Sequence, residues 1–89
     1  MIKLIAAELV DEREIRLRFS DNSSGTLDFS PFLDANTPMT APLRDPAFFR
    51  RFFLELGALA WPNGFDLSAA SLQRRLDEGG RLTRSSAAA

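Results

Sequence analysis

Polar and apolar residues alternate over residues 14–20, and this alternation constrains the fold more than any other feature of the sequence. A period of two is typical of a β-strand that has one face in the core and the other in solvent. We therefore predict a strand here. Its core face carries Ile15, Leu17 and Phe19, and its outer face carries Arg16 and Arg18.

Two further strands are predicted, one on each side of this strand in the sequence. Residues 2–10 are mostly apolar, and residues 26–29 resume the alternation with Leu27 and Phe29 directed inward. Residues 21–25, Asp-Asn-Ser-Ser-Gly, form a dense turn signal before the third strand. The first third of the chain is therefore expected to be an antiparallel three-stranded meander with loops of three to five residues.

Two helix-start signals follow the meander. Ser30 precedes Pro31, and Asp45 precedes Pro46. Serine and aspartate suit the N-cap position, and proline suits the first helical position. Each pair therefore predicts a short helix, with Ser30 and Asp45 as caps and a proline-rich loop between the two helices.

The run that begins at residue 46 admits two interpretations. Propensity allows one helix over residues 46–56. Gly57, which separates two apolar runs, favours instead a strand, a tight turn and a second strand that ends at Trp61. The aromatic character of the run favours this hairpin. A strand directs Phe52 and Phe53 to opposite faces, so one of the two is expected to be exposed.

The segment Trp61-Pro62-Asn63-Gly64 predicts a β-turn, because proline presets the backbone for the second turn position and glycine tolerates positive φ. Asp66 and Ser68 are two candidate N-caps for a helix over residues 69–77. Gly79 and the glycine after it are expected to end this helix.

Together these elements predict an α+β fold. It is a small antiparallel sheet of about five strands, the meander plus a two-stranded hairpin, with one or two short helices on one face. Residues 1–80 are expected to form a single domain and residues 81–89 a flexible C-terminal tail. No stretch approaches the ~20 apolar residues of a membrane-spanning helix.

Histidine and cysteine are both absent from the 89 residues. Their absence excludes Ser-His-Asp and Cys-His catalysis, histidine general bases, the usual zinc sites and disulfide bonds. The chain also lacks a glycine-rich phosphate-binding motif. We therefore expect a cytoplasmic protein that is not an enzyme and uses neither a cofactor nor a metal ion.

Carboxylates keep one enzymatic alternative open. Asp28, Asp34, Asp45 and Asp66 offer oxygen atoms for a metal ion or an acid–base pair, but their spacing does not match a calcium loop. Asp45 and Asp66 are more typical of helix caps and turns. A carboxylate-dependent enzyme is therefore the second alternative function.

The net charge of the chain limits which classes of partner are expected. A net charge of −1 and a pI of about 5.3 argue against nucleic-acid binding driven by bulk positive charge. Lys3 is the only lysine, and arginine makes bidentate contacts with carboxylates and phosphates. The outward pair Arg16 and Arg18 still offers a local basic face. A nucleic-acid-associated module is therefore the first alternative.

Aromatic residues exceed what one small core needs in the stretch Phe48, Phe49, Phe52 and Phe53. An exposed aromatic patch usually marks an interface, so we expect a homodimer or a small hetero-complex. Trp61 joins this surface if its ring is exposed. The candidate interaction surface comprises Arg16, Arg18, Phe53, Trp61 and Asp66.

In order along the chain, these motifs resemble the bacterial domain-of-unknown-function family 2442 (DUF2442), over about residues 2–76. The matching parts are the strands around Leu17 and Leu27, the Leu43-Arg44-Asp45-Pro46 segment and the Leu72 helix. The Trp-Pro-Asn-Gly-x-Asp segment at residues 61–66 is the most specific. The same fold occurs in small proteins described as resembling the N-terminal domain of a Nitrosomonas protein.

The resemblance implies an α+β fold and no assigned activity. Family members are often encoded beside another small protein, which implies a regulatory or antitoxin-like partnership with a protein. Some carry a helix-turn-helix after this domain, and none is expected here. The chain departs from the family in its longer turn at residues 21–25 and in the Phe52-Phe53-Leu54 run before the tryptophan.

Overall fold

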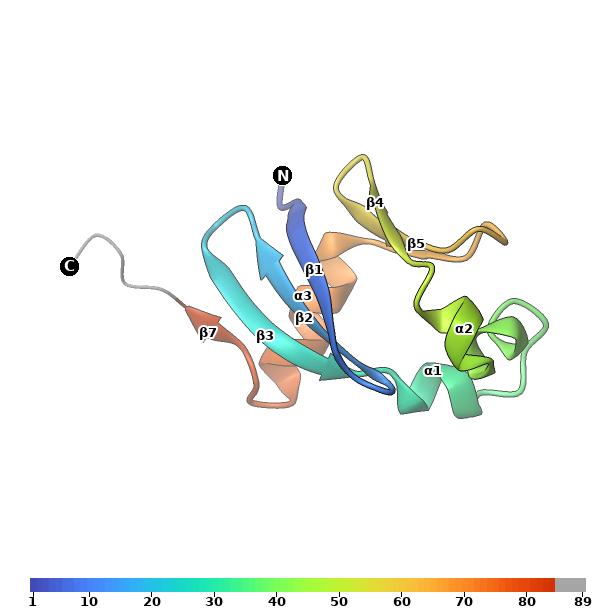
Figure 1. The fold of residues 1–89 in the computed structure, drawn as a ribbon. Helices are drawn as coiled ribbons and strands as arrows, with labels where there is room; N and C mark the ends of the chain where they lie inside the picture. The colour runs from blue at the N-terminus through green and yellow to red at the C-terminus, as the bar shows by residue number, and fades with distance from the viewer. Residues whose placement is uncertain (85–89) are drawn as a thin grey trace.

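A computed structural model describes residues 1–84, and its architecture is the predicted α+β class. Two antiparallel sheets are present: sheet A has the strand order β1-β2-β3-β7, and sheet B has the order β4-β5-β6 (Figure 1). The strands are β1 (Leu4–Asp11), β2 (Glu14–Phe19), β3 (Ser23–Asp28), β4 (Phe53–Glu55), β5 (Ala58–Ala60), β6 (Asp66–Leu67) and β7 (Thr83–Arg84). The helical segments are α1 (Ser30–Asp34), the 3-10 helix η1 (Ala41–Arg44), α2 (Pro46–Phe49) and α3 (Ala69–Glu78).

Sheet A contains the predicted meander, β1 to β3. Ile15, Leu17 and Phe19 on β2 are fully buried, whereas Arg16 and Arg18 are exposed, as the alternation predicts. Burying three large apolar side chains from one strand contributes about 2 kcal/mol each to folding. The register of this strand is therefore fixed, because a slip of one residue would exchange its two faces.

The two loops of the meander differ in length. The β2–β3 loop has three residues, as predicted. The β1–β2 loop has only two residues, Glu12 and Arg13, so the expected length of three to five is wrong there. The reason is that β1 continues past an irregularity after Leu9, which lets Asp11 pair with Glu14.

Sheet B confirms the strand-turn-strand interpretation. The helix α2 ends at Phe49, and β4 and β5 pair antiparallel as a hairpin. Asp45 caps α2, because its side chain accepts a hydrogen bond from the N–H of Ala47 at 3.0 Å. The predicted β-turn is also present: the N–H of Gly64 donates to the carbonyl of Trp61 at 3.0 Å. The turn leads into β6, a third short strand that the sequence pattern does not predict.

The helix α3 begins and ends close to the predicted residues. Ser68 is its N-cap and accepts a hydrogen bond from the N–H of Ser71 at 3.2 Å. The other candidate cap, Asp66, lies in β6 instead. Leu72 and Leu76 of this helix are fully buried, and Gly79 is its C-cap.

The predicted cap of α1 is wrong. Phe29 occupies the N-cap position, and Ser30 lies in the first turn. The N–H of Ser30 donates to Oδ1 of Asp28 at 2.9 Å, so Asp28 supplies the hydrogen-bond acceptor. Hydrogen bonds from Ser30 lower the pKa of Asp28. This aspartate therefore has a local structural role at the junction of β3 and α1.

The C-terminal segment joins sheet A. Residues 81–89 are predicted to be a tail, but Thr83–Arg84 form β7 and pair with Ser23 and Ser24 of β3. Residues 85–89 of that predicted tail lie outside the described residues. The longest helix, α3, has ten residues, and none of the helices between residues 1 and 84 is both long and apolar enough to cross a membrane.

Gly25 on β3 packs closely against α3 and the segment that follows it. A Cβ at this position would lie 2.6 Å from the carbonyl oxygen of Arg81 and 3.1 Å from a methyl group of Leu76. We predict that Gly25→Ala lowers the free energy of unfolding by about 1–3 kcal/mol, because the helix must move to relieve the clash. Urea unfolding measures this change, and Ser24→Ala, one residue away, should stay within about 0.5 kcal/mol of wild type.

Asp21 connects the β2–β3 loop to α3. Its carboxylate accepts hydrogen bonds from the N–H and hydroxyl of Ser23 at 3.0 and 2.6 Å, and from Nε2 of Gln73 at 2.9 Å. Arg84 lies 3.4 Å from the same carboxylate. The hydrogen bonds from Ser23 are the main reason that the pKa of Asp21 is lowered.

The lowered pKa of Asp21 predicts a loss of stability in acid. The contribution of this carboxylate is fully present above its unfolded pKa, at about pH 4, and is lost as the pH falls through the lower folded pKa. Asp21→Asn should therefore be less stable than wild type at pH 6, and the difference should shrink towards pH 3. Unfolding free energies measured across this range test the prediction, and a difference that stays constant with pH would contradict it.

Candidate interaction surface

The structure places four of the five predicted surface residues at the surface and one in the core. Arg16, Arg18, Phe53 and Asp66 are exposed. Trp61 is only 1% exposed, so its predicted place on the interaction surface is wrong. Its indole Nε1–H donates to a backbone carbonyl at 2.9 Å, and aromatic rings surround it, which makes the core its most favourable position.

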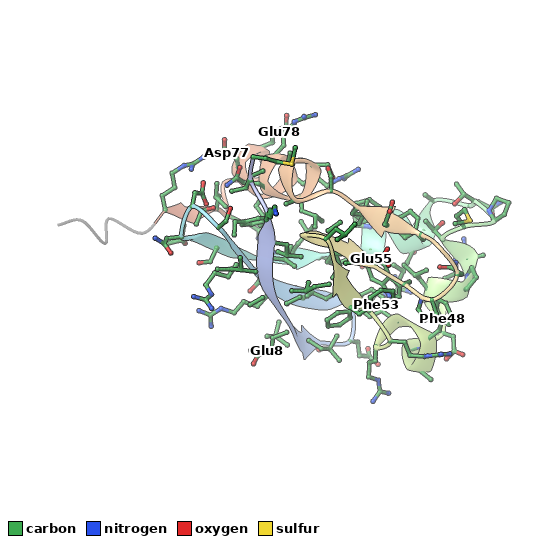
Figure 2. The ribbon with its side chains drawn as sticks, turned by 90° about the horizontal axis from the view of Figure 1, so that it is seen from above. Glu8, Phe48, Phe53, Glu55, Asp77 and Glu78 are labelled. Atoms are coloured by element: carbon green, nitrogen blue, oxygen red, sulfur yellow. The ribbon has the colours of Figure 1, made fainter. Side chains whose placement is uncertain are left out.

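The two faces of sheet A differ in what covers them. Figure 2 shows α3, which carries Asp77 and Glu78, on one side of the molecule, and Glu8 and Phe53 on the opposite side. Glu8 is the direct partner of Arg16 in the β1–β2 ladder, so Arg16 and Arg18 lie on the side that Glu8 occupies. Among residues 1–84 no helix covers this side of β1 to β3. We call it the helix-free face.

Sheet B adds an aromatic residue and two carboxylates to this face. Phe53, Ala60 and Asp66 are direct cross-strand neighbours on β4, β5 and β6, so their side chains share one face of the sheet. Glu55 lies two residues after Phe53 and shares that face as well. Phe53 is 42% exposed, as predicted for one member of the Phe52–Phe53 pair.

The segment Phe53-Leu54-Glu55-Leu56 is exposed along its whole length. Leu56 is 97% exposed at the tip of the β4–β5 hairpin. Its φ is +50°, and that of Gly57 is +83°, so both turn residues have a left-handed backbone. A two-residue turn of this kind favours Asn-Gly or Gly-Gly, and here leucine occupies the first position.

The outer edge of β4 is partly closed by β1. The N–H of Leu4 donates to the carbonyl of Gly57 at 2.8 Å, and β1 lies beside β4 (Figure 1). A partner strand therefore cannot pair along this whole edge. The side chains of the exposed segment are the groups that remain available for contact.

A hollow of about 280 Å³ lies on the helix-free face, lined by Ala6, Ala7, Glu8, Arg16 and Arg18. Acidic residues separate the arginines from any wider basic area: Glu8 lies opposite Arg16, and Glu14 lies opposite Asp28. The arginines therefore form a small cationic spot and not a continuous basic surface of the kind that follows a nucleic-acid backbone.

Asp21 and Asp28 have local structural roles. The pKa values of Asp21 and Asp28 are both lowered by hydrogen bonds from nearby serines, which suits turn residues. A general acid at neutral pH needs a raised pKa. In the part of the chain described, no three acidic side chains converge to form a metal site.

Sequence reasoning missed Leu56 as a surface residue. The available signal was the Leu-Gly dipeptide between two short apolar strands, at a position where Asn-Gly is the usual choice. A leucine at that position has neither a favourable backbone conformation nor a buried side chain.

Comparison with known proteins identifies one match. A family model described as "Protein of unknown function (DUF2442)" matches residues 4–78. The matched range begins with β1 and ends with α3, so it includes the meander, the β4–β5 hairpin and the Trp61–Gly64 turn. No curated protein and no solved structure matches the chain.

Because Trp61 lies in the core, its replacement should affect stability and not binding. We predict that Trp61→Phe lowers the free energy of unfolding by about 2–4 kcal/mol, since it leaves a void and removes the hydrogen bond to the carbonyl of Phe49. Thermal and urea unfolding measure this loss. A variant as stable as wild type would contradict the structural role given to the indole.

Proposed function

This chain belongs to the DUF2442 family of proteins of unknown function, and we propose that it is a non-enzymatic protein-interaction module. In this proposal it acts in the cytoplasm as a regulatory or accessory partner of another protein chain. The contact surface is the exposed β4 segment, Phe53 to Leu56, with the adjoining helix-free face.

Leu56 is the observation that carries the proposal. A left-handed backbone costs a non-glycine residue about 1–2 kcal/mol. Full exposure also forgoes the about 2 kcal/mol that a buried leucine side chain contributes. The first term disfavours leucine in the isolated chain, and the second is a gain that the isolated chain does not realise. A partner that buries this side chain recovers the second term, which gives the residue a reason to be there.

The neighbours of Leu56 extend this contact. Phe53 and Leu54 lie on opposite faces of β4 just before the turn at Leu56, and each is exposed by about two fifths. Glu55 between them keeps the segment soluble. Apolar and aromatic side chains surrounded by polar ones are typical of the centre of a protein–protein interface.

The arrangement of charge favours a protein over a nucleic acid as the partner. Arg16 and Arg18 have Glu8 and Glu14 close to them in the strand register. A phosphate backbone is attracted by continuous positive charge, whereas a protein surface pairs with both signs. The mixed charges of this face therefore support protein binding.

Leu56→Asn tests the proposal. Asparagine tolerates the left-handed backbone, so the variant should be as stable as wild type or more stable by about 0.5–1 kcal/mol. In a capture experiment with native-host extract, proteins retained by immobilised wild type should be lost with the variant. Quantitative mass spectrometry measures the retained proteins.

Met39→Gln is the matched control. The exposed fraction of Met39 is close to that of Phe53, but Met39 lies outside the β4 segment. It should retain the same proteins as wild type. If wild type and Leu56→Asn capture the same set in equal amounts, the β4 segment is not the contact surface and the proposal fails.

A further inference from the structure

Phe53 is an exposed apolar side chain with negative charge beside it. Glu55 and Asp66 share its face of sheet B. In residues 1–84 the only ion pairs are Arg13–Asp34 and Arg84–Asp21, so neither carboxylate is paired with a cation there. Phe53 is therefore a partly exposed aromatic side chain, called the knob here, with two free carboxylates on the same face of sheet B.

The hollow between β1 and β2 has the opposite character. Ala6 lies on this face opposite Arg18, and its small side chain leaves the space open. Ala7 lies opposite Leu17, and its side chain packs against the core. Arg16 and Arg18 flank the hollow, and Glu8 contributes one negative charge, which leaves a net positive rim. Its volume of about 280 Å³ is ample for a phenyl ring. A guanidinium group beside such a ring adds a favourable cation–π contact.

The knob and the hollow lie on the same side of the molecule. Glu8, at the hollow, and Phe53 both lie away from α3 in Figure 2. In an isologous dimer, a two-fold axis brings a patch of one copy onto a second patch of the other, and the reverse contact follows by symmetry. β1 lies between β2, which lines the hollow, and β4, which carries the knob. A two-fold axis through the helix-free face near β1 therefore places the knob of each copy on the hollow of the other.

We propose that a second copy of this chain binds the helix-free face, with Phe53 of each copy in the hollow between Arg16 and Arg18 of the other. Glu55 and Asp66 of one copy then face the two arginines of its partner. Each copy therefore contributes both charge signs, so the contact occurs twice and closes the dimer. This inference rests on the proposed interaction role, and it adds a second copy of this chain as a partner beside the other protein chain proposed above.

Paired charge reversals test the dimer. In sedimentation velocity at rising concentration, the wild type should dimerise. The double variant Arg16→Glu with Arg18→Glu should stay monomeric, and so should Glu55→Arg with Asp66→Arg. An equimolar mixture of the two double variants should form a heterodimer, because every pair of facing charges is again opposite in sign.

Two further variants sharpen the result. Phe53→Ala should weaken self-association roughly 30-fold, as expected for an aromatic residue at the centre of an interface. Arg74→Glu, a charge reversal on the exposed side of α3, should leave self-association unchanged. Circular dichroism checks that each variant is folded. Association of the two double variants on mixing is independent evidence that both are folded.

A wild type that remains monomeric at millimolar concentration overturns the dimer. So does a dimer that both double variants retain, or a mixture that does not associate. These outcomes leave the capture experiment with Leu56→Asn unaffected, because that experiment detects a different chain. Loss of the dimer and loss of the interaction role are therefore distinguishable.

Discussion

The packing of aromatic rings around Trp61 is the interaction on which the rest of the structure depends. Phe29 follows the last strand of the meander, Phe49 belongs to α2, and Phe65 precedes β6; each ring centre lies within 6.0 Å of the indole. The indole N–H also donates a hydrogen bond to the carbonyl of Phe49. This single residue thus links sheet A, the helical connection and sheet B, none of which is large enough to form a core alone.

Periodicity and turn chemistry predict the parts of this fold that depend on local sequence. The alternation around Leu17 gives the central strand and its faces, and Ser68 and Gly79 give the limits of α3 because caps act over a few residues. The strands β6 and β7 have two residues each, too few to show a period. Their pairing depends on contacts with segments distant in the sequence.

The surface was less accessible to prediction than the core. Residue types indicate that Arg16, Arg18 and Phe53 are good contact residues, but not that one face holds all three. That arrangement follows from the position of α3 on the other face and from β1 lying between β2 and β4. The sequence likewise leaves open whether the ring of Trp61 is buried, since a turn signal does not say which side of the turn faces the core.

The hydrogen bond between Leu4 and Gly57 has a consequence for solubility. A short apolar strand at an open sheet edge is a template for aggregation, because unpaired backbone groups recruit further copies without limit. Here β1 occupies one end of that edge, next to the turn at Gly57, and β4 itself has only three residues. The free part of the edge is therefore too short for a long ladder of added strands, which limits aggregation while Phe53, Leu54 and Leu56 stay exposed.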